Sequence, residues 1–253
     1  MSDLDDAFLD GLENGSVYAV FHPIVDANKS LVGFEILTRW RINQEVLLPD
    51  DFLPLLKREA SWLALARYLV NTAVRKINEY EGVYFFSFNI SNVEASSNEF
   101  IQLVANSKEC LMSVDWIRKM VIEFSERINV KDSFKVISVM KALREIGCVI
   151  YLDDILSHDS TIYPVQVIKF DGVKIDKAII KQMKKNNILI SLIKTTIYFC
   201  SLTDIVCIAE GIENDNQLNV LVSFGVRYFQ GYLISKPIED IMLGSFVISC
   251  KNS

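Results

Sequence analysis

The chain has 253 residues, 51% of them hydrophobic and 23% charged, a composition that is typical of a globular protein with a sizeable core and excludes extended disorder. The formal net charge of −6 argues against DNA, RNA or an anionic membrane as a partner, although a small anion bound through metal ions stays compatible. The five cysteines contain no Cys-x-x-Cys pair, and the acidic amino terminus lacks the basic start of a secretory signal. We therefore expect a cytoplasmic protein with reduced thiols and no membrane contact.

Apolar, β-branched runs alternate with amphipathic segments along the chain. The runs predict about eight strands, near residues 17–24, 31–37, 83–90, 119–124, 147–153, 166–170, 205–209 and 226–229. Between them, helical periodicity predicts helices over 62–77, 131–146, 188–202 and 214–223, the last of which ends at Gly225. The apolar stretch 188–207 contains Lys194 and Asp204, which disfavours a membrane span and favours a buried helix running into a strand.

Strands that alternate with helices predict a parallel sheet, and eight such units predict closure into an α/β barrel. A barrel of this length fits one domain, so we expect a single domain over residues 1–253 with a core of about 15–245. In barrel enzymes the chemistry lies at the carboxyl ends of the strands.

Acidic or amide side chains stand at the ends of four predicted strands. The runs are Phe34-Glu35-Ile36-Leu37, Phe88-Asn89-Ile90-Ser91, Ile122-Glu123-Phe124-Ser125-Glu126 and Tyr151-Leu152-Asp153-Asp154. Mg²⁺ or Mn²⁺ takes oxygen ligands, and Glu35, Asn89, Glu123 and Asp153 supply such a set. Asp154 can join only if the chain turns there; Asp153 would then bridge two ions that activate water and stabilise a leaving alkoxide on phosphorus. Taken singly, each residue is more often a cap or turn residue, so the joint pattern carries the prediction.

Three further strand ends carry polar residues. Lys174 would place an ammonium where it could orient water or neutralise phosphate, and Glu210 follows the run 205–208, with Gly211 permitting a sharp exit. Gln230 ends the last predicted strand and could hold a water or a base edge. Each has an ordinary alternative: a surface ion pair for Lys174, a helix start for Glu210 and a loop amide for Gln230.

Together these runs resemble the motifs of the EAL domain, the bacterial family of cyclic di-GMP phosphodiesterases that act in second-messenger signalling, biofilm formation and motility. The name motif Glu-Ala-Leu appears as Glu35-Ile36-Leu37, and Asn-Leu-Ser as Asn89-Ile90-Ser91. The other matches, in the family's order, are Glu123-Phe124-Ser125-Glu126, Asp153-Asp154, Lys174-Ile175-Asp176, Ala209-Glu210-Gly211-Ile212-Glu213 and Gln230-Gly231-Tyr232. Single motifs of this kind are weak, whereas seven in order across nearly the whole chain are specific.

The resemblance implies a modified TIM (β/α)8 barrel whose first strand runs antiparallel, with the active site at its mouth. It implies two Mg²⁺ or Mn²⁺ ions, one held by Glu35, Asn89, Glu123 and Asp153, the other by Asp153, Asp154 and Glu210. It assigns Lys174 to the attacking water, Gln230 to the water or metal shell, Leu37, Arg39 and Glu213 to the ligand side, and Glu126 to anchoring the loop after Asp154. The implied reaction opens cyclic di-GMP to linear pGpG, and the implied assembly is a homodimer across the mouth-side helices.

The loop after Asp154 departs from the family pattern. Phe-Gly-Thr-Gly-Tyr-Ser-Ser is replaced by Ile155-Leu156-Ser157-His158-Asp159-Ser160-Thr161, so a positive φ at either former glycine would be strained. Pro164 falls where the family continues a helix, so we expect that helix to be shortened or to begin at Pro164. His22-Pro23 replaces Gln-Pro, and we expect His22 and His158 to be structural or loop residues because the metal mechanism needs no histidine.

The altered loop keeps an alternative open: a degenerate domain that binds cyclic di-GMP or a protein partner without turnover. A third possibility is a different metal-dependent phosphohydrolase on a similar barrel. The matches at Lys174 and Gln230 and at the ligand contacts disfavour that third possibility.

Overall fold

The computed structural model describes residues 3–125, 133–156, 169–183 and 186–251 of the chain. Within these ranges, eight strands close into a barrel in the order β1-β9-β8-β7-β6-β5-β4-β2, with β2 pairing back to β1. β1 runs antiparallel to both barrel neighbours, and the other barrel pairs are parallel. The predicted modified TIM barrel with an antiparallel first strand is confirmed. The barrel strands are β1 (Val17–Asp26), β2 (Leu31–Ile42), β4 (Phe85–Ile90), β5 (Met120–Ser125), β6 (Val149–Ile155), β7 (Gly172–Ile175), β8 (Val206–Ala209) and β9 (Tyr228–Gln230).

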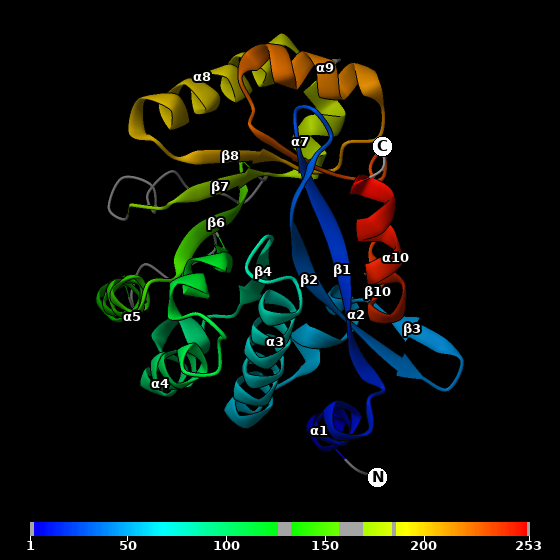
Figure 1. Ribbon diagram of the computed structural model, residues 1–253, viewed down its shortest axis with the longest axis vertical. Coiled ribbons are helices and arrows are strands. Elements are labelled where there is room, and N and C mark those ends of the chain that lie inside the picture. The colour runs from blue at the N-terminus through cyan, green and yellow to red at the C-terminus, as the bar shows by residue number, and fades with distance from the viewer. Residues whose placement is uncertain (1–2, 126–132, 157–168, 184–185, 252–253) are drawn as a thin grey trace.

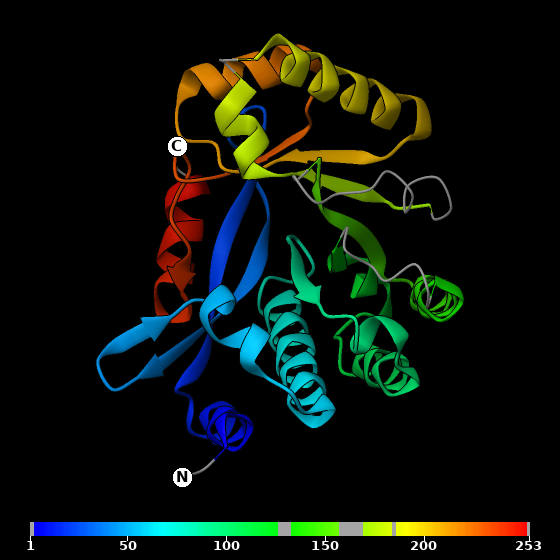
Figure 2. The ribbon, with the colours of Figure 1, turned by 180° about the vertical axis from the view of Figure 1, so that it is seen from behind.

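Helices surround the strands on the outside (Figures 1 and 2). Two short strands extend the sheet: β3 (Glu45–Leu47) pairs with β2, and β10 (Ile238–Glu239) pairs with β1. No helix within the described ranges combines the length and the apolar character needed to cross a membrane. The helices are α1 (Leu4–Asn14), α2 (Pro49–Phe52), α3 (Glu59–Glu79), α4 (Asn98–Lys108), α5 (Ser133–Ile146), α7 (Lys177–Gln182), α8 (Asn187–Thr203), α9 (Asp215–Phe224) and α10 (Asp240–Lys251), with 3-10 turns η1 (Leu53–Leu55), η2 (Glu94–Ser96) and η3 (Val114–Lys119).

One predicted strand is misplaced. Of the range 166–170, residues 166–168 lie outside the described part of the chain, Lys169 and Phe170 are not in a strand, and β7 begins only at Gly172. Asp171 gives the physical reason, because its backbone N–H donates to the Ile150 carbonyl (2.8 Å) and its carboxylate accepts from the Ile150 N–H (2.9 Å). The chain is therefore fastened to β6 before its own strand starts. The other seven ranges overlap β1, β2, β4, β5, β6, β8 and β9.

The predicted helices overlap α3, α5, α8 and α9, whereas α1, α2, α4, α7 and α10 have no counterpart among them. Residues 131 and 132 of the second range lie outside the described residues. α8 runs into β8 as expected, but it is buried on one face only: Ile193 and Cys200 are buried, whereas Ile188 is 77% and Leu202 66% exposed. The prediction of a buried helix is wrong for the outer face of α8, because hydrophobicity alone does not say what covers a helix.

Side chains alternate between two environments along each barrel strand. One set points into the barrel, where a small apolar cluster forms a floor of Ile24, Val121, Tyr151 and Ile208. Two residues further along their strands stand Glu123 on β5, Asp153 on β6 and Glu210 just past β8. The period of two thus places a polar mouth directly above an apolar floor. The other set, including Phe34, Phe86 and Phe124, belongs to the main core that packs with the helices.

Candidate metal and active site

The polar residues at the strand ends meet at the mouth of the barrel. Glu35 on β2, Glu123 on β5 and Lys174 on β7 are buried. Asn89 on β4 stands beside Glu123 in the β4–β5 ladder. Asp153 on β6 stands beside Ser125, two positions after Glu123 on β5. Parallel strands that end at one edge therefore bring together residues that lie far apart in the sequence.

The Lys174 ammonium lies at the centre of this group. Its Nζ is 2.6 Å from Glu210 Oε1, 2.9 Å from Glu123 Oε2, 3.2 Å from Glu35 Oε2 and 3.3 Å from Asp153 Oδ1. An ammonium has three N–H donors, so it cannot satisfy four carboxylates fully at once. The ordinary alternative of a surface ion pair is wrong for Lys174, because the side chain is buried among the strand-end carboxylates.

Two amides hold the Glu35 carboxylate from other sides. Gln230 Nε2 donates to Glu35 Oε2 (2.8 Å), and Asn89 Nδ2 donates to Glu35 Oε1 (3.0 Å). Gln230 is buried, and its Oε1 has no hydrogen-bond partner among the described residues. A buried amide oxygen without a partner is unfavourable, and a cation or a water at the mouth would satisfy it.

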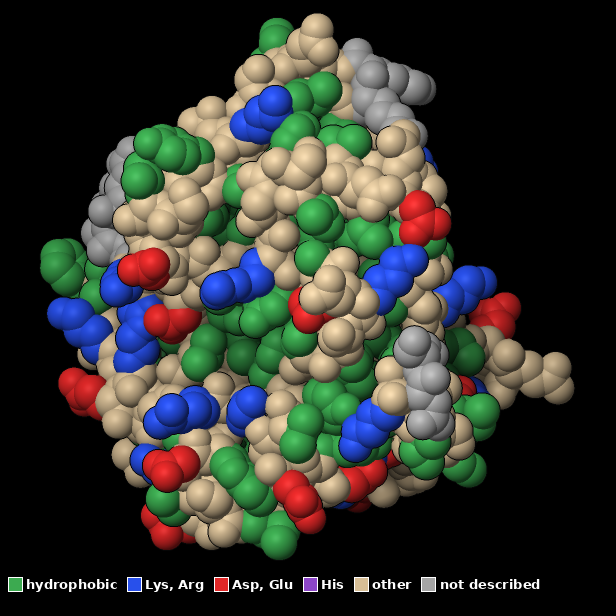
Figure 3. Space-filling model, turned by 45° about the horizontal axis from the view of Figure 1, so that its top comes forward, with side chains coloured by type: hydrophobic (Ala, Val, Ile, Leu, Met, Phe, Trp, Pro, Cys, Tyr) green, Lys and Arg blue, Asp and Glu red, His purple; other side chains and the backbone are tan. Residues whose placement is uncertain are grey.

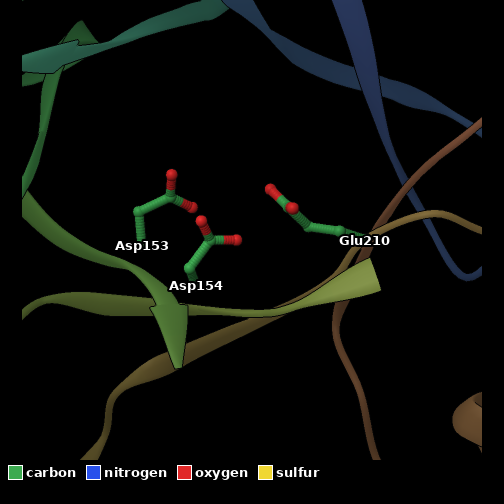
Figure 4. A group of neighbouring side chains, drawn as sticks. All are labelled: Asp153, Asp154 and Glu210. Carbon is green, nitrogen blue, oxygen red and sulfur yellow. The ribbon is translucent and has the colours of Figure 1, made fainter. Parts of the chain in front are cut away.

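Asp153 and Asp154 both reach the mouth because β6 is irregular there. In a regular strand, neighbouring side chains point to opposite faces. Here the β6–β7 register shifts between Leu152 and Ile155, and Asp154 has a φ of 55°. Carboxylate oxygens of Asp153, Asp154 and Glu210 consequently lie within 4.8 Å of one another and point toward a common space (Figure 4). Carboxylates at this spacing could hold a metal ion. The turn at Asp154 is the one expected from the sequence if Asp154 is to reach the site.

Among the described residues, acidic side chains outnumber basic ones at the mouth. Four carboxylates contact the Lys174 ammonium, those of Glu35, Glu123, Asp153 and Glu210, and the carboxylate of Asp154 lies close to two of them. Burial raises the pKa of Glu123 to about 8 and also raises the pKa values of Asp153 and Glu210. Burial acts on Glu35 in the same direction, but Lys174, His22 and Gln230 together outweigh it and lower the pKa of that carboxyl. Carboxylate and amide oxygens are the ligands that hard divalent ions prefer, so the donor set fits Mg²⁺ or Mn²⁺.

The residues assigned to the ligand side differ in how close they lie to the mouth. Leu37 and Arg39 follow Glu35 at alternate positions of β2 and are half-buried, and Arg39 Nη1 donates to the Thr38 carbonyl (2.7 Å). Glu213 is exposed before α9, where its backbone N–H donates to Gln217 Oε1 (2.8 Å). No contact among the described residues brings Glu213 into the group around Lys174.

His22 lies next to Glu35 across the β1–β2 ladder. Its Nε2 is buried without a hydrogen-bond partner among the described residues, and burial lowers the pKa of His22 to about 4, so the ring is neutral. The other histidine, His158, lies outside the described residues together with Glu126, Pro164 and the rest of the segment 157–161. Leu156, at the position of the first missing glycine, is described and has a φ of 71°. That region is strongly disfavoured for a bulky side chain, so the strain expected from the loss of glycine is present at Leu156.

Two features of the mouth are not among the predicted site residues. Ser87 is buried beneath Asn89 on β4 and stands beside Glu35 in the β2–β4 ladder; the signal for it is the period of two in Ser87-Phe88-Asn89. A cavity of about 360 Å³ opens beside the strand ends, lined by Trp62, Ile90, Ser91, Asn92, Val93, Ala95, Phe124 and Ser125. Trp62 comes from the first turn of α3, and no motif marks it.

A closed barrel with one antiparallel strand defines an α/β-barrel protein, and its mouth gathers carboxylates, amides and a lysine that could hold a cation. The family model described as "EAL domain" matches residues 3–237. The chain belongs to the EAL domain family.

Two relatives from Escherichia coli (strain K12) are similar over most of the chain. The probable cyclic di-GMP phosphodiesterase PdeB is 30% identical over 246 residues, covering 92% of this chain and 45% of the relative. The cyclic di-GMP phosphodiesterase PdeL is 25% identical over 233 residues, covering 90% of this chain and 64% of the relative. This chain therefore spans only about half to two thirds of the length of these relatives.

Solved structures of the same family share the fold. The PaMucR phosphodiesterase in complex with c-di-GMP superposes with a TM-score of 0.86 at 20% identity, over 96% of this chain and 100% of that one. The EAL enzyme Bd1971 bound to cAMP and cyclic di-GMP gives 0.85 at 24% identity, over 98% of this chain and 68% of that one. At these identities the similarity supports the fold and says nothing about activity.

Proposed function

We propose that the chain is a metal-dependent cyclic di-GMP phosphodiesterase, a hydrolase that opens one phosphodiester to give linear pGpG. The observation that carries the proposal is the mouth itself. Four carboxylates there contact a single lysine, two amides donate to one of these carboxylates, and Asp154 lies close to two others. Membership of the EAL family and the names of the E. coli relatives support cyclic di-GMP as the substrate.

In this proposal Glu35, Asn89, Glu123 and Asp153 would hold one Mg²⁺ or Mn²⁺ ion, and Asp153, Asp154 and Glu210 a second. Two such ions, when bound, make water more acidic and neutralise charge that develops on the phosphate oxygens. The irregular end of β6 supports the sharing of Asp153, because it presents both aspartates to one space.

The other mouth residues act on water and substrate. Lys174 orients the attacking water, and Gln230 keeps Glu35 in place while its free Oε1 holds a water. Arg39 pairs with a phosphate, for which a guanidinium is well suited, and Leu37 packs against the dinucleotide. Glu213 borders the ligand from the α9 side. The cavity at the ends of β4 and β5, which Trp62 helps to line, offers an apolar surface for a base.

One observation favours a second function, in which the domain binds cyclic di-GMP or a protein partner without turnover. Leu156 holds a left-handed conformation two residues after Asp154, where the family has glycine. Strain at that point would disturb the placement of Asp154 more than that of Glu35 or Glu123, which lie on regular strands.

We also infer that the chain forms a homodimer through α8. Ile188, Leu192, Thr195, Phe199 and Leu202 recur at spacings of four and three, so they lie along one side of the helix. The four apolar members are between 39% and 77% exposed. Lys194, the one charged residue of α8, places its Nζ 4.5 Å from the ring centre of Phe224 on α9. The end of the molecule that carries α8 and α9 shows few charged side chains (Figure 3). Two copies of an uncharged stripe can pair without like-charge repulsion.

Light scattering coupled to size exclusion tests the homodimer. Wild type should elute with twice the chain mass, whereas Phe199→Glu, which places a charge in the stripe, should elute as a monomer. Lys194→Glu changes charge on α8 without entering the stripe and should remain dimeric. A monomeric wild type would rule the homodimer out.

Product analysis tests the activity. Purified protein is incubated with cyclic di-GMP and Mg²⁺ or Mn²⁺, and the nucleotides are separated by chromatography. Formation of pGpG that stops on chelation supports the phosphodiesterase. Binding of cyclic di-GMP without product would support the second function, and preferential cleavage of another phosphodiester in competition would indicate a different phosphohydrolase.

A further inference from the structure

Lys174 occupies the position at the mouth that suits a cation. Its buried ammonium contacts carboxylates from four segments: β2, β5, β6 and the residues after β8. The contacts with Glu210 (2.6 Å) and Glu123 (2.9 Å) are short, whereas those with Glu35 (3.2 Å) and Asp153 (3.3 Å) are longer. Because three N–H groups serve four acceptors, the two longer contacts are the weaker ones.

A metal ion would need the same oxygens. Mg²⁺ binds carboxylate oxygens at about 2.0–2.1 Å and uses lone pairs that point toward it. Glu35 Oε2 already accepts a hydrogen bond from Gln230 Nε2 (2.8 Å) and also contacts Lys174, and Asp153 Oδ1 contacts Lys174 as well. An ammonium and a divalent ion a few ångströms apart repel each other, more strongly in a buried site than in water. The Lys174 ammonium and a metal ion would therefore compete for the same oxygen atoms.

We propose that Lys174 is a built-in competitor of the metal ions: metal binding displaces its ammonium from Glu35 and Asp153, while its contacts with Glu210 and Glu123 persist. The inference rests on the proposed metal-dependent function and adds that Lys174 sets how tightly the ions bind. In this role Lys174 holds the carboxylates together between binding events, besides orienting water during the reaction.

A merely structural lysine would behave in the opposite way. If Lys174 only held the strand ends in place, its removal would let the carboxylates move apart and would weaken metal binding. If Lys174 competes, its removal frees the oxygens of Glu35, Glu123, Asp153 and Glu210 from the ammonium that contacts them, and metal binding tightens. The direction of the change in metal affinity separates the two roles.

Calorimetric titration of Mn²⁺ into metal-stripped protein measures this direction. Lys174→Met keeps most of the side-chain length and removes the charge. We expect this variant to bind Mn²⁺ on the order of tenfold more tightly than wild type. Lys181→Met, which alters an exposed lysine of α7, should bind like wild type. Equal or weaker binding by Lys174→Met overturns the competitor role, and no Mn²⁺ binding by any of the three proteins overturns the metal-dependent function on which it rests.

Thermal unfolding keeps the test decisive when the variant folds poorly without metal. The competitor role predicts that Lys174→Met melts below wild type in the presence of a chelator, because repulsion among the carboxylates is no longer compensated. Added Mn²⁺ should then raise the melting temperature of Lys174→Met by more than it raises that of wild type. A smaller rise for the variant would overturn the proposal.

Discussion

Lys174 at the barrel mouth and Lys76 on α3 are both almost fully buried, but their surroundings differ. Lys76 Nζ contacts Glu79 Oε2 (2.6 Å) and Asp240, and it lies 5.4 Å from the ring centre of Phe21. Arg75 adds a second cation, with Nη2 2.6 Å from Asp240 Oδ2. Two cations thus face two carboxylates, and this balanced group, which we call the Lys76 cluster, ties α3 to α10.

The mouth is unbalanced by comparison. Among the described residues, one ammonium contacts four carboxylates, and a buried amide oxygen of Gln230 lacks a partner. Buried charge without a partner of opposite sign destabilises a fold. A protein retains such charge where a bound ligand of opposite sign compensates it. Balanced buried charge is what a structural cluster needs, whereas an excess of one sign marks a site for a ligand of the opposite sign.

Removing a carboxylate from the mouth should abolish turnover while the fold remains. We expect Glu35→Ala to lower the rate of pGpG formation on the order of 100-fold or more, because Glu35 is a proposed metal ligand and the acceptor of two amide donors. Circular dichroism should show a folded protein, since the variant relieves an excess of negative charge. Glu45→Ala, on the exposed strand β3, serves as the control and should keep full activity. An active Glu35→Ala would show that the mouth is not the reaction centre.

Removing Lys76 from the Lys76 cluster should have the reverse effect, with stability lost and turnover kept. Lys76→Met leaves Glu79 and Asp240 with only Arg75, and we expect a loss of about 2 kcal/mol in the free energy of unfolding. This value lies below that of a fully buried pair because both carboxylates remain partly exposed to solvent. Urea unfolding measures the loss, and Arg67→Met, which removes a cation from an exposed pair with Glu99, should change stability by less than about 1 kcal/mol. Loss of turnover in correctly folded Lys76→Met would contradict the purely structural role of the Lys76 cluster.

The Lys76 cluster should also give stability a characteristic dependence on pH. Burial raises the pKa of Asp240, but hydrogen bonds from Lys76 and Arg75 outweigh it, so the pKa of Asp240 lies below 3.8. A carboxyl whose pKa is lowered by folding stabilises the protein above its unfolded pKa, and this contribution is lost as the pH falls through the folded pKa. Asp240→Asn should therefore cost about 1 kcal/mol near neutral pH, discounted for partial exposure, and should lessen the loss of stability below about pH 4.

Urea unfolding midpoints across this acid range check the prediction. Asp215→Asn removes a carboxylate from the exposed pair with Lys29 and should leave the acid dependence as in wild type. An unchanged acid dependence in Asp240→Asn would mean that Asp240 titrates alike in the folded and unfolded chain.

The mouth could be predicted from the sequence because it follows from strand periodicity. Polar residues that stand two positions after apolar ones at successive strand ends come together at the mouth of a parallel barrel. The grouping of Glu123, Asp153 and Glu210 could therefore be predicted without knowledge of tertiary contacts. The turn at Asp154 could be stated only as a condition, because it depends on a register shift between β6 and β7.

The Lys76 cluster had no comparable signal. Its partners on α3 and α10 are brought together by the packing of two helices, and a lysine in an amphipathic helix is usually exposed. The late start of β7 escaped prediction for the same kind of reason, since the hydrogen bonds of Asp171 with Ile150 are tertiary. Patterns along one strand or helix are local, whereas these features depend on neighbours that the local pattern does not specify.

The smallest effect concerns the loop that follows the unbalanced site. Leu156 has a φ of 71°, which glycine adopts without strain. Leu156→Gly should therefore relieve backbone strain of about 1 kcal/mol or more. Glycine also gains entropy in the unfolded chain, so the net stabilisation should be about 0.5 kcal/mol. Glu81→Gly, at φ 51° in the turn after α3, is the matched control and should give a similar gain. The two variants should differ in turnover: relaxed backbone next to Asp154 should raise the rate of pGpG formation in Leu156→Gly, and Glu81→Gly should leave it unchanged. Equal rates in both variants and in wild type would show that strain at Leu156 does not limit the site.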